Sequence, residues 1–227
     1  MKFSRVSISR DVQDFCGWNF LLEIISACRT PSEKGLVATL FETGCRVSEL
    51  LMLKKSNFIL DMHPELIVMD GVPVLKKYRK IDEVPDPQKK SGRRWVTEPV
   101  VRYRTFPIKK SEPLVKPMLD WLEKVRGEKV FPQFDRVKNK RHKVLYLIRE
   151  IGSRIKRERI PFSQIPPNKL HPHWFRDQRA RQLKVDYRFD SLDLAGFFDW
   201  EMPQLGAVPE YAKPGWRELA WKMGVEV

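Results

Sequence analysis

Arg46 is the first residue whose type and setting indicate chemistry. It follows Gly44 and Cys45 in FETGCRVSELLML (41–53), a run that is otherwise largely apolar. A guanidinium stays charged at physiological pH, and burying it without a partner is costly. Either Glu49, one helical turn later, neutralises Arg46, or an anion from outside the protein does.

His173 and Arg176 are three residues apart in HPHWFRDQRARQL (171–183). Pro172 is typical of the first position of a helix, and residues three apart on a helix project from one face. A histidine can transfer a proton near neutral pH and an arginine cannot, so the pair would combine acid/base chemistry with a fixed anion clamp. The alternative is a surface histidine paired with an arginine.

Tyr211 is confined to a short segment between Pro209 and Pro214, within FFDWEMPQLGAVPEYAKPG (197–215). A tyrosine in such a place often serves in packing. The functional interpretation is a phenolic nucleophile, made effective by nearby guanidinium groups that stabilise its anion.

Basic residues exceed acidic ones, with 43 Lys+Arg against 29 Asp+Glu and a formal charge of +14. This balance is typical of nucleic-acid binding. Single clusters of this kind are common on solvated surfaces, but several together favour a track for DNA phosphates. The candidate DNA-binding residues are Lys76, Arg79, Lys89, Lys90, Arg93, Arg94, Lys138, Lys140 and Arg141.

The order of these motifs resembles the catalytic domain of the tyrosine recombinases, the phage-integrase family. TGCRVSELLML is similar to the first arginine box of that family, and LHPHWFR to the second. FFDWEMPQLGAVPEYA is similar to the final box, with Asp199-Trp200 where a Gly-His pair is usual. The interval from Trp200 to Tyr211 is longer than the usual one. HPHWFR and FFDW look closest to integrases of archaeal viruses and plasmids.

The resemblance implies a catalytic role for Arg46, His173, Arg176, Trp200 and Tyr211. It also implies a lysine on a β-hairpin that protonates the leaving 5′ oxygen. Lys76 and Lys77 in GVPVLKKYRK are candidates, and Lys89 and Lys90 remain alternatives. Strand alternation puts Lys76 and Lys77 on opposite faces, and we favour Lys77.

The function implied is site-specific recombination through a 3′-phosphotyrosyl intermediate on double-stranded DNA, without metal, ATP or another cofactor. It further implies dimers or tetramers on DNA and a cytoplasmic, nucleoid-associated location. Three alternatives remain: type IB topoisomerase-like relaxation, a catalytically dead DNA-binding module, and a metal-dependent nuclease using carboxylates of VDYRFDSLDLAGFFDWE (185–201). The acidic residues of that segment are more simply a solvated helix face.

The elements that must position these residues are mostly helices. GWNFLLEIISAC predicts one helix, and Thr30, Pro31 and Glu33 predict the capped start of another that stops at Gly44. Arg46 then opens a helix that buries Val47, Leu50, Leu51 and Met52, and whose N-terminus would add to an anion site.

Apolar and β-branched runs between Phe58 and Ile108 predict a small antiparallel sheet, and the polar insert 80–99 predicts a long mobile hairpin tip. Five helical segments follow Pro113. The last carries an apolar stripe of Trp216, Leu219, Ala220 and Met223, which would dock on a neighbouring protomer or, for the free protein, on its own core.

The expected fold class is therefore mainly α (α+β), a helical recombinase catalytic fold with a three-stranded antiparallel sheet. From the resemblance we expect residues 1–227 to form one catalytic domain, without an N-terminal core-binding domain. The three cysteines have no CxxC spacing, so neither a disulfide framework nor a zinc site is indicated. No apolar run approaches the ~20 residues of a membrane span.

Overall fold

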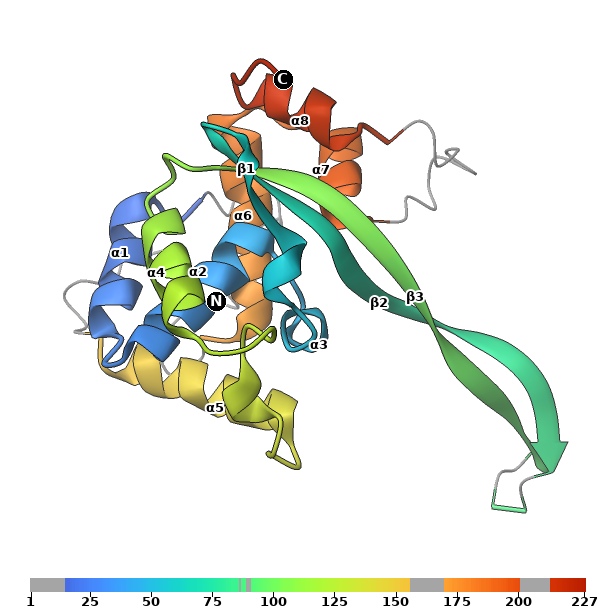
Figure 1. The fold of residues 1–227 in the computed structure, drawn as a ribbon. Helices are drawn as coiled ribbons and strands as arrows, with labels where there is room; N and C mark the ends of the chain where they lie inside the picture. The colour runs from blue at the N-terminus through green and yellow to red at the C-terminus, as the bar shows by residue number, and fades with distance from the viewer. Residues whose placement is uncertain (1–14, 86, 89–90, 156–169, 201–212) are drawn as a thin grey trace, which may run out of the picture.

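The computed structural model describes residues 15–85, 87–88, 91–155, 170–200 and 213–227. In this part of the chain, α-helices surround one end of a three-stranded sheet (Figure 1). One 3₁₀ turn, Lys55–Asn57, directly precedes the sheet, and another, Pro132–Phe134, lies between two of the helices. The helices are α1 (Trp18–Ala27), α2 (Pro31–Thr43), α3 (Val47–Leu50), α4 (Val115–Lys124), α5 (Lys140–Ser153), α6 (Pro172–Asp186), α7 (Ser191–Phe198) and α8 (Trp216–Lys222). The predicted mainly α fold with a small antiparallel sheet is confirmed.

Helix α2 is the centre of the hydrophobic core. From Gly35 to Thr43 every residue is buried, including Leu36, Val37, Leu40 and Phe41. A helix that is buried on all sides needs partners on all sides, and α1, α4 and α6 pack against it. A Cβ at Gly35 would lie 2.3 Å from the Trp121 side chain, so α4 approaches α2 closely at this glycine.

The two ends of α2 are set by local chemistry. The Thr30 hydroxyl accepts a hydrogen bond from the Glu33 N–H at 3.1 Å, and the Glu33 carboxylate accepts one from the Arg29 N–H at 2.7 Å. At the other end Gly44 has φ +55°, the left-handed conformation that favours glycine. A Cβ at Gly44 would also lie 2.3 Å from a ring atom of Phe198. The predicted start and stop of this helix are confirmed.

The sheet has the order β1-β2-β3 and is antiparallel throughout. Its strands are β1 (Phe58–His63), β2 (Leu66–Pro85) and β3 (Arg93–Lys109). Strands β2 and β3 pair from Leu66 opposite Lys109 to Pro85 opposite Arg93, and form a long ribbon that leaves the helical body (Figure 1).

This ribbon corrects the prediction for the polar insert 80–99. Most of the insert is strand, and the ladder stops only at Pro85 and Arg93. Two paired strands satisfy each other's backbone hydrogen bonds whatever their side chains, whereas hydrophobic alternation detects only strands that have a buried face.

Helix α8 packs on the body of its own chain. Leu219, Ala220 and Met223 are buried, and the Lys109 ammonium donates a hydrogen bond to the Met223 carbonyl at 3.1 Å. Trp216 is half-buried. The expectation that the apolar stripe docks on its own core is confirmed. Across the described ranges, no helix combines the length and the apolar character that crossing a bilayer requires.

Candidate functional site

Arg46 lies immediately before α3, at its N-cap. Its Nη1 donates to Glu49 Oε1 at 3.0 Å, and its backbone N–H donates to Glu49 Oε2 at 2.8 Å. Glu49 is fully buried, while the Arg46 side chain keeps 32% of its surface exposed. The first possibility raised by the sequence is confirmed, since Glu49 binds Arg46 on one side. The other side of Arg46 is open to solvent, and an external anion there stays a prediction.

Helix α3 is much shorter than predicted. It has four residues, Leu50 is its buried apolar residue, and Met52, expected in the core, is 45% exposed. A single turn aligns too few peptide dipoles to make an anion site by itself. The positive character of this place therefore comes from side chains.

Helix α6 carries Arg176 to the end of α2. The Arg176 guanidinium donates to the Gly44 carbonyl through Nη1 and to the Phe198 carbonyl at 3.3 Å through Nη2. Its Nη1 lies 3.8 Å from Glu49 Oε2, so Glu49 faces Arg46 and Arg176 together. Arg176 is 2% exposed, and the two carbonyls replace part of its hydration.

Burial, together with the positive charges of Arg104 and Arg46, lowers the pKa of Arg176 to about 9. The opposite charge of Glu49 acts against this shift. At neutral pH the guanidinium remains charged. Burial is the largest cause of the shift, and the charges of the neighbouring arginines add to it.

Trp200 completes this group from the end of α7. Its ring stacks on Phe198 with centroids 4.9 Å apart and an interplanar angle of 18°. The Arg176 Cζ lies 4.6 Å from the Phe198 ring centroid and 5.8 Å from that of Trp200. Asp199 turns the chain here with φ +51°. The structure therefore brings together Arg46, Arg176 and Trp200, which are far apart in the sequence.

Arg104 on β3 belongs to the same cluster and was not predicted. It is 5% exposed, and it donates to the carbonyls of Phe197 and, at 2.9 Å, Thr43. A detectable signal existed in VVRYRTFPI, where Arg104 alternates in step with the buried Phe106 and Ile108. A charged residue on the inward face of a strand indicates a buried polar site.

His173 lies on the first turn of α6 and is exposed. No hydrogen bond joins it to Arg46, Arg176 or Trp200 among the described residues, and unlike Arg176 it does not face the buried cluster. The predicted proline start of this helix is confirmed, but His171 is the N-cap and accepts a hydrogen bond from the Trp174 N–H at 3.2 Å.

A buried network around Arg179 fixes α6 one turn after Arg176. Arg179 pairs with Glu112 and, at 3.2 Å, with Glu42, and the Tyr187 hydroxyl donates to Glu112 at 2.7 Å. Burial and the negative charge of Glu112 raise the pKa of Glu42. Because Glu42 is near the end of α2, the network holds α6 against the helix end that Arg176 contacts.

Seven of the predicted residues, or their side chains, fall outside the part of the chain that the structure describes. Tyr211, Lys89 and Lys90 lie outside the described residues, as do the side chains of Lys76, Lys77, Arg79 and Arg94. The backbone of Lys77 pairs with Val100, and the register shifts between Leu75 and Lys77. Such a shift interrupts strict alternation, so the argument from opposite faces does not apply at Lys76.

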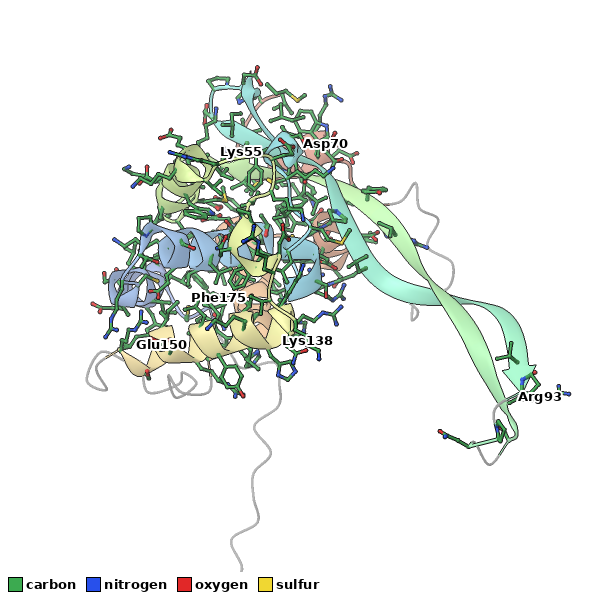
Figure 2. The ribbon with its side chains drawn as sticks, turned by 60° about the horizontal axis from the view of Figure 1, so that its bottom comes forward. Lys55, Asp70, Arg93, Lys138, Glu150 and Phe175 are labelled. Atoms are coloured by element: carbon green, nitrogen blue, oxygen red, sulfur yellow. The ribbon has the colours of Figure 1, made fainter. Side chains whose placement is uncertain are left out.

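The remaining basic candidates lie at two separate places (Figure 2). Arg93 is exposed at the far end of the β2–β3 ribbon, where its Nη1 is 3.6 Å from Glu83 Oε2. Lys138 and Arg141 are exposed at the start of α5, and Lys140 is 3.5 Å from Asp135. They therefore do not form one continuous patch on the described surface.

The aspartates of the segment weighed for metal ligands have structural partners instead, and Glu201 lies outside the described residues. Asp190 caps α7 by accepting from the Leu192 and Asp193 N–H groups, at 2.7 and 3.0 Å. Asp193 binds Lys222, and Asp199 binds Lys213 at 2.8 Å. Asp193 and Asp199 are buried, so the expectation of a solvated face is wrong for these two. No group of three or more potential metal ligands occurs among the residues that the structure describes.

Comparison of the chain with models of known protein families and with curated proteins finds no match. The recombinase resemblance therefore depends on the motifs of this chain and on how they meet in its fold.

Proposed function

We propose that this protein is a tyrosine site-specific recombinase that binds a DNA phosphate at the cluster of Arg46, Arg104, Arg176 and Trp200. The observation that carries the proposal is the charge of this cluster. Arg46 and Arg176 share one carboxylate, Glu49, no carboxylate among the described residues pairs with Arg104, and Arg46 faces solvent. Such an excess of positive charge is suited to an external anion, and planar guanidinium groups match phosphate oxygens.

In the proposed reaction the Tyr211 hydroxyl oxygen attacks the phosphorus of a DNA phosphodiester. The bond to the 5′ oxygen breaks, which leaves a 3′-phosphotyrosyl link and a 5′-hydroxyl. Lys77 supplies the proton of that hydroxyl, and His173 takes the proton of Tyr211. Arg46 contacts the non-bridging oxygens, assisted by the Trp200 indole N–H and the charge of Arg176. Reversal of these steps rejoins the strand, so the bond energy is conserved and no ATP is required.

The ion pair between Lys213 and Asp199 joins the end of α7, next to Trp200, to the residues that precede α8. Tyr211 stands two residues before Lys213 in the sequence and lies outside the described residues. The assignment of Tyr211 as the nucleophile therefore rests on its motif.

Tyr187 is a poor alternative nucleophile. Its hydroxyl donates to Glu112 at 2.7 Å, and burial together with the Glu112 charge raises its pKa. A phenol whose anion is disfavoured in this way attacks phosphorus slowly.

A DNA-binding protein without cleavage activity is the second candidate, and the burial of Arg176 favours it. At 2% exposure Arg176 acts on a phosphate through its charge rather than by direct contact, unless the site opens. Both candidates imply double-stranded DNA as partner and a location on the nucleoid. Self-association into dimers or tetramers belongs to the recombinase alone, because it exchanges strands between two duplexes.

Covalent trapping distinguishes the two candidates. We expect the wild-type protein, in EDTA, to form an adduct with nicked duplexes of randomised sequence that survives a denaturing gel. Peptide mapping should place the DNA on the fragment VPEYAKPGW (208–216). Tyr211→Phe should bind DNA as wild type does and form no adduct, since it lacks the attacking oxygen.

Tyr187→Phe is the matched control, and its adduct yield should equal that of the wild-type protein at a temperature where both are folded. An adduct that persists in Tyr211→Phe, or that is lost in Tyr187→Phe, would show that the nucleophile has been misassigned. Binding without any adduct from the wild-type protein would favour the non-cleaving candidate.

A further inference from the structure

We propose that Arg104 is a positioning residue of the phosphate site, which ties the ends of α2 and α7 together and adds its own charge to the field that holds the phosphate. The inference rests on the proposed function, because it concerns the same site. Three observations support the inference independently of any motif: the hydrogen bonds of Arg104, its burial, and the lack of a carboxylate paired with it among the described residues.

Arg104 and Arg176 make the same kind of connection side by side. Arg104 donates to the carbonyls of Thr43 and Phe197. Arg176 donates to the carbonyls of the residues that follow these two in the sequence, Gly44 and Phe198. Thr43 and Gly44 end α2, and Phe197 and Phe198 end α7. The guanidinium groups of Arg104 and Arg176 therefore both join the C-termini of α2 and α7, and α7 leads directly to Trp200.

These bonds explain how the buried charge is tolerated. The last carbonyls of a helix lack partners within the helix and carry its negative dipole end. Arg104 also lies 3.4 Å from Cys45 Sγ, and its Cζ is 4.4 Å from the Phe106 ring centroid. Its positive charge is thus solvated by dipoles, a thiol and a ring.

No carboxylate of the described chain pairs with Arg104, whereas Arg46 and Arg176 share Glu49. Its Nε is buried without a hydrogen-bond partner among the described residues. A neutral amide side chain could donate to the same carbonyls without burying a charge. A link between the two helix ends that only stabilised the fold would therefore not require an arginine. The uncompensated charge is the feature that points to an anion.

The test measures binding of inorganic phosphate to the whole protein by titration calorimetry, with chloride adjusted to hold the ionic strength constant. Arg104→Gln removes the charge and keeps an amide donor, while Arg104→Lys keeps the charge and loses the planar fork. Arg154→Gln is the matched control, because Arg154 is another poorly exposed arginine, paired with Glu33 at 2.7 Å near the opposite end of α2.

We expect Arg104→Gln to weaken phosphate binding by at least about ten-fold and Arg104→Lys by less than about three-fold, since a unit charge this near an anion acts over several ångströms of low-dielectric protein. Arg154→Gln should bind phosphate as wild type does. Arg46→Gln should abolish the signal and so locate it. Equal binding by the wild-type protein and both Arg104 variants, or no saturable binding by the wild-type protein, overturns the inference.

A second measurement does not depend on the folding of the variants. In the wild-type protein, phosphate should move the ¹⁵N and ¹H resonances of Arg104 Nε together with those of Arg46 Nε. Movement of Arg46 alone overturns the inference. Neither measurement involves DNA cleavage, so a protein that passes both and forms no covalent adduct would retain the Arg104 assignment and lose the proposed reaction.

Discussion

Glu49 is the residue that organises the site at the scale of single side chains. One carboxylate, fully buried, holds the Arg46 backbone and guanidinium and also faces Arg176 at 3.8 Å. A buried carboxylate between two guanidinium groups keeps both of them in place but neutralises only one charge. The arrangement thus orients Arg46 without cancelling the positive excess that an external phosphate requires.

Arg46→Lys tests whether Arg46 must both bind Glu49 and contact the phosphate. The ammonium keeps the charge, but it offers no planar fork for two phosphate oxygens while it also binds Glu49. We expect adduct formation in single-turnover assays to fall by at least about 100-fold, with DNA affinity changed by less than about three-fold. Loss of the folded circular dichroism spectrum would instead make Arg46 a structural partner of Glu49.

Four residues of the cluster were foreseeable in principle, and three were predicted. Arg46, Arg176 and Trp200 stand in short motifs whose spacing carries information, and the fold brings them together as expected. Arg104 has no motif, and its inward direction follows only from the register of β3 against the core. The Glu42–Glu112–Arg179 contacts were beyond sequence reasoning, because they join three separate segments through tertiary packing.

At the scale of elements, helix ends rather than helix faces make the site. The C-termini of α2 and α7 receive both buried arginines, and the N-cap of α6 sets the position of the helix that carries Arg176. Helix starts and stops were predictable, because Thr30, Pro31, Gly44 and Pro172 have strong positional preferences. The length of α3 and of the β2–β3 ribbon was not, since neither has a hydrophobic period.

The α6 cap predicts a pH dependence. Burial, and after it the charge of His173, lowers the pKa of His171, while Asp177 acts in the opposite direction and Arg149 in the same one. Only the neutral imidazole accepts the Trp174 N–H. The unfolded chain therefore takes up a proton first as pH falls, so the contribution is complete above pH ~7, diminishes through the ordinary histidine pKa of ~6.5, and stops changing below the folded pKa.

His171→Asn keeps a capping acceptor that does not titrate. We expect its free energy of unfolding, from urea titrations between pH 5 and 8, to lack the part of the wild-type decline that begins near pH 6.5. The difference between the two proteins isolates His171 from other titrating groups. Parallel pH profiles for the two proteins would show that the cap does not depend on the His171 charge.

At the scale of the whole molecule, charge is distributed along a body and a long arm. The β2–β3 ribbon separates Arg93 from Lys138 (Figure 2). We define two groups of basic residues by their place in the sequence: the hairpin-tip patch, of which Arg93 has a described side chain (Lys89, Lys90, Arg93 and Arg94), and the α5 patch (Lys138, Lys140 and Arg141). Strand β2 has 20 residues, and at ~3.3 Å per residue it extends at most about 65 Å, which is close to the length of 19 base pairs. The basic composition was evident from the sequence, but the reach of the arm was not.

The last prediction uses this reach. If both patches contact the phosphates of one duplex, each neutralised contact contributes about 0.9 to the slope of log affinity against log salt. Replacing the α5 patch by glutamines should therefore reduce the slope by up to about 3, and replacing the hairpin-tip patch by up to about 4. On a duplex of about 30 base pairs we expect both reductions, measured by filter binding, and they should add in the combined variant.

On a duplex of about 10 base pairs, shorter than the arm, the hairpin-tip variant should match the wild-type protein, because a duplex held at the body ends before it reaches the tip. A hairpin-tip effect that is equal on the two duplexes would mean that the tip binds DNA independently of the body, and the absence of an effect on both would remove the arm from the DNA interface.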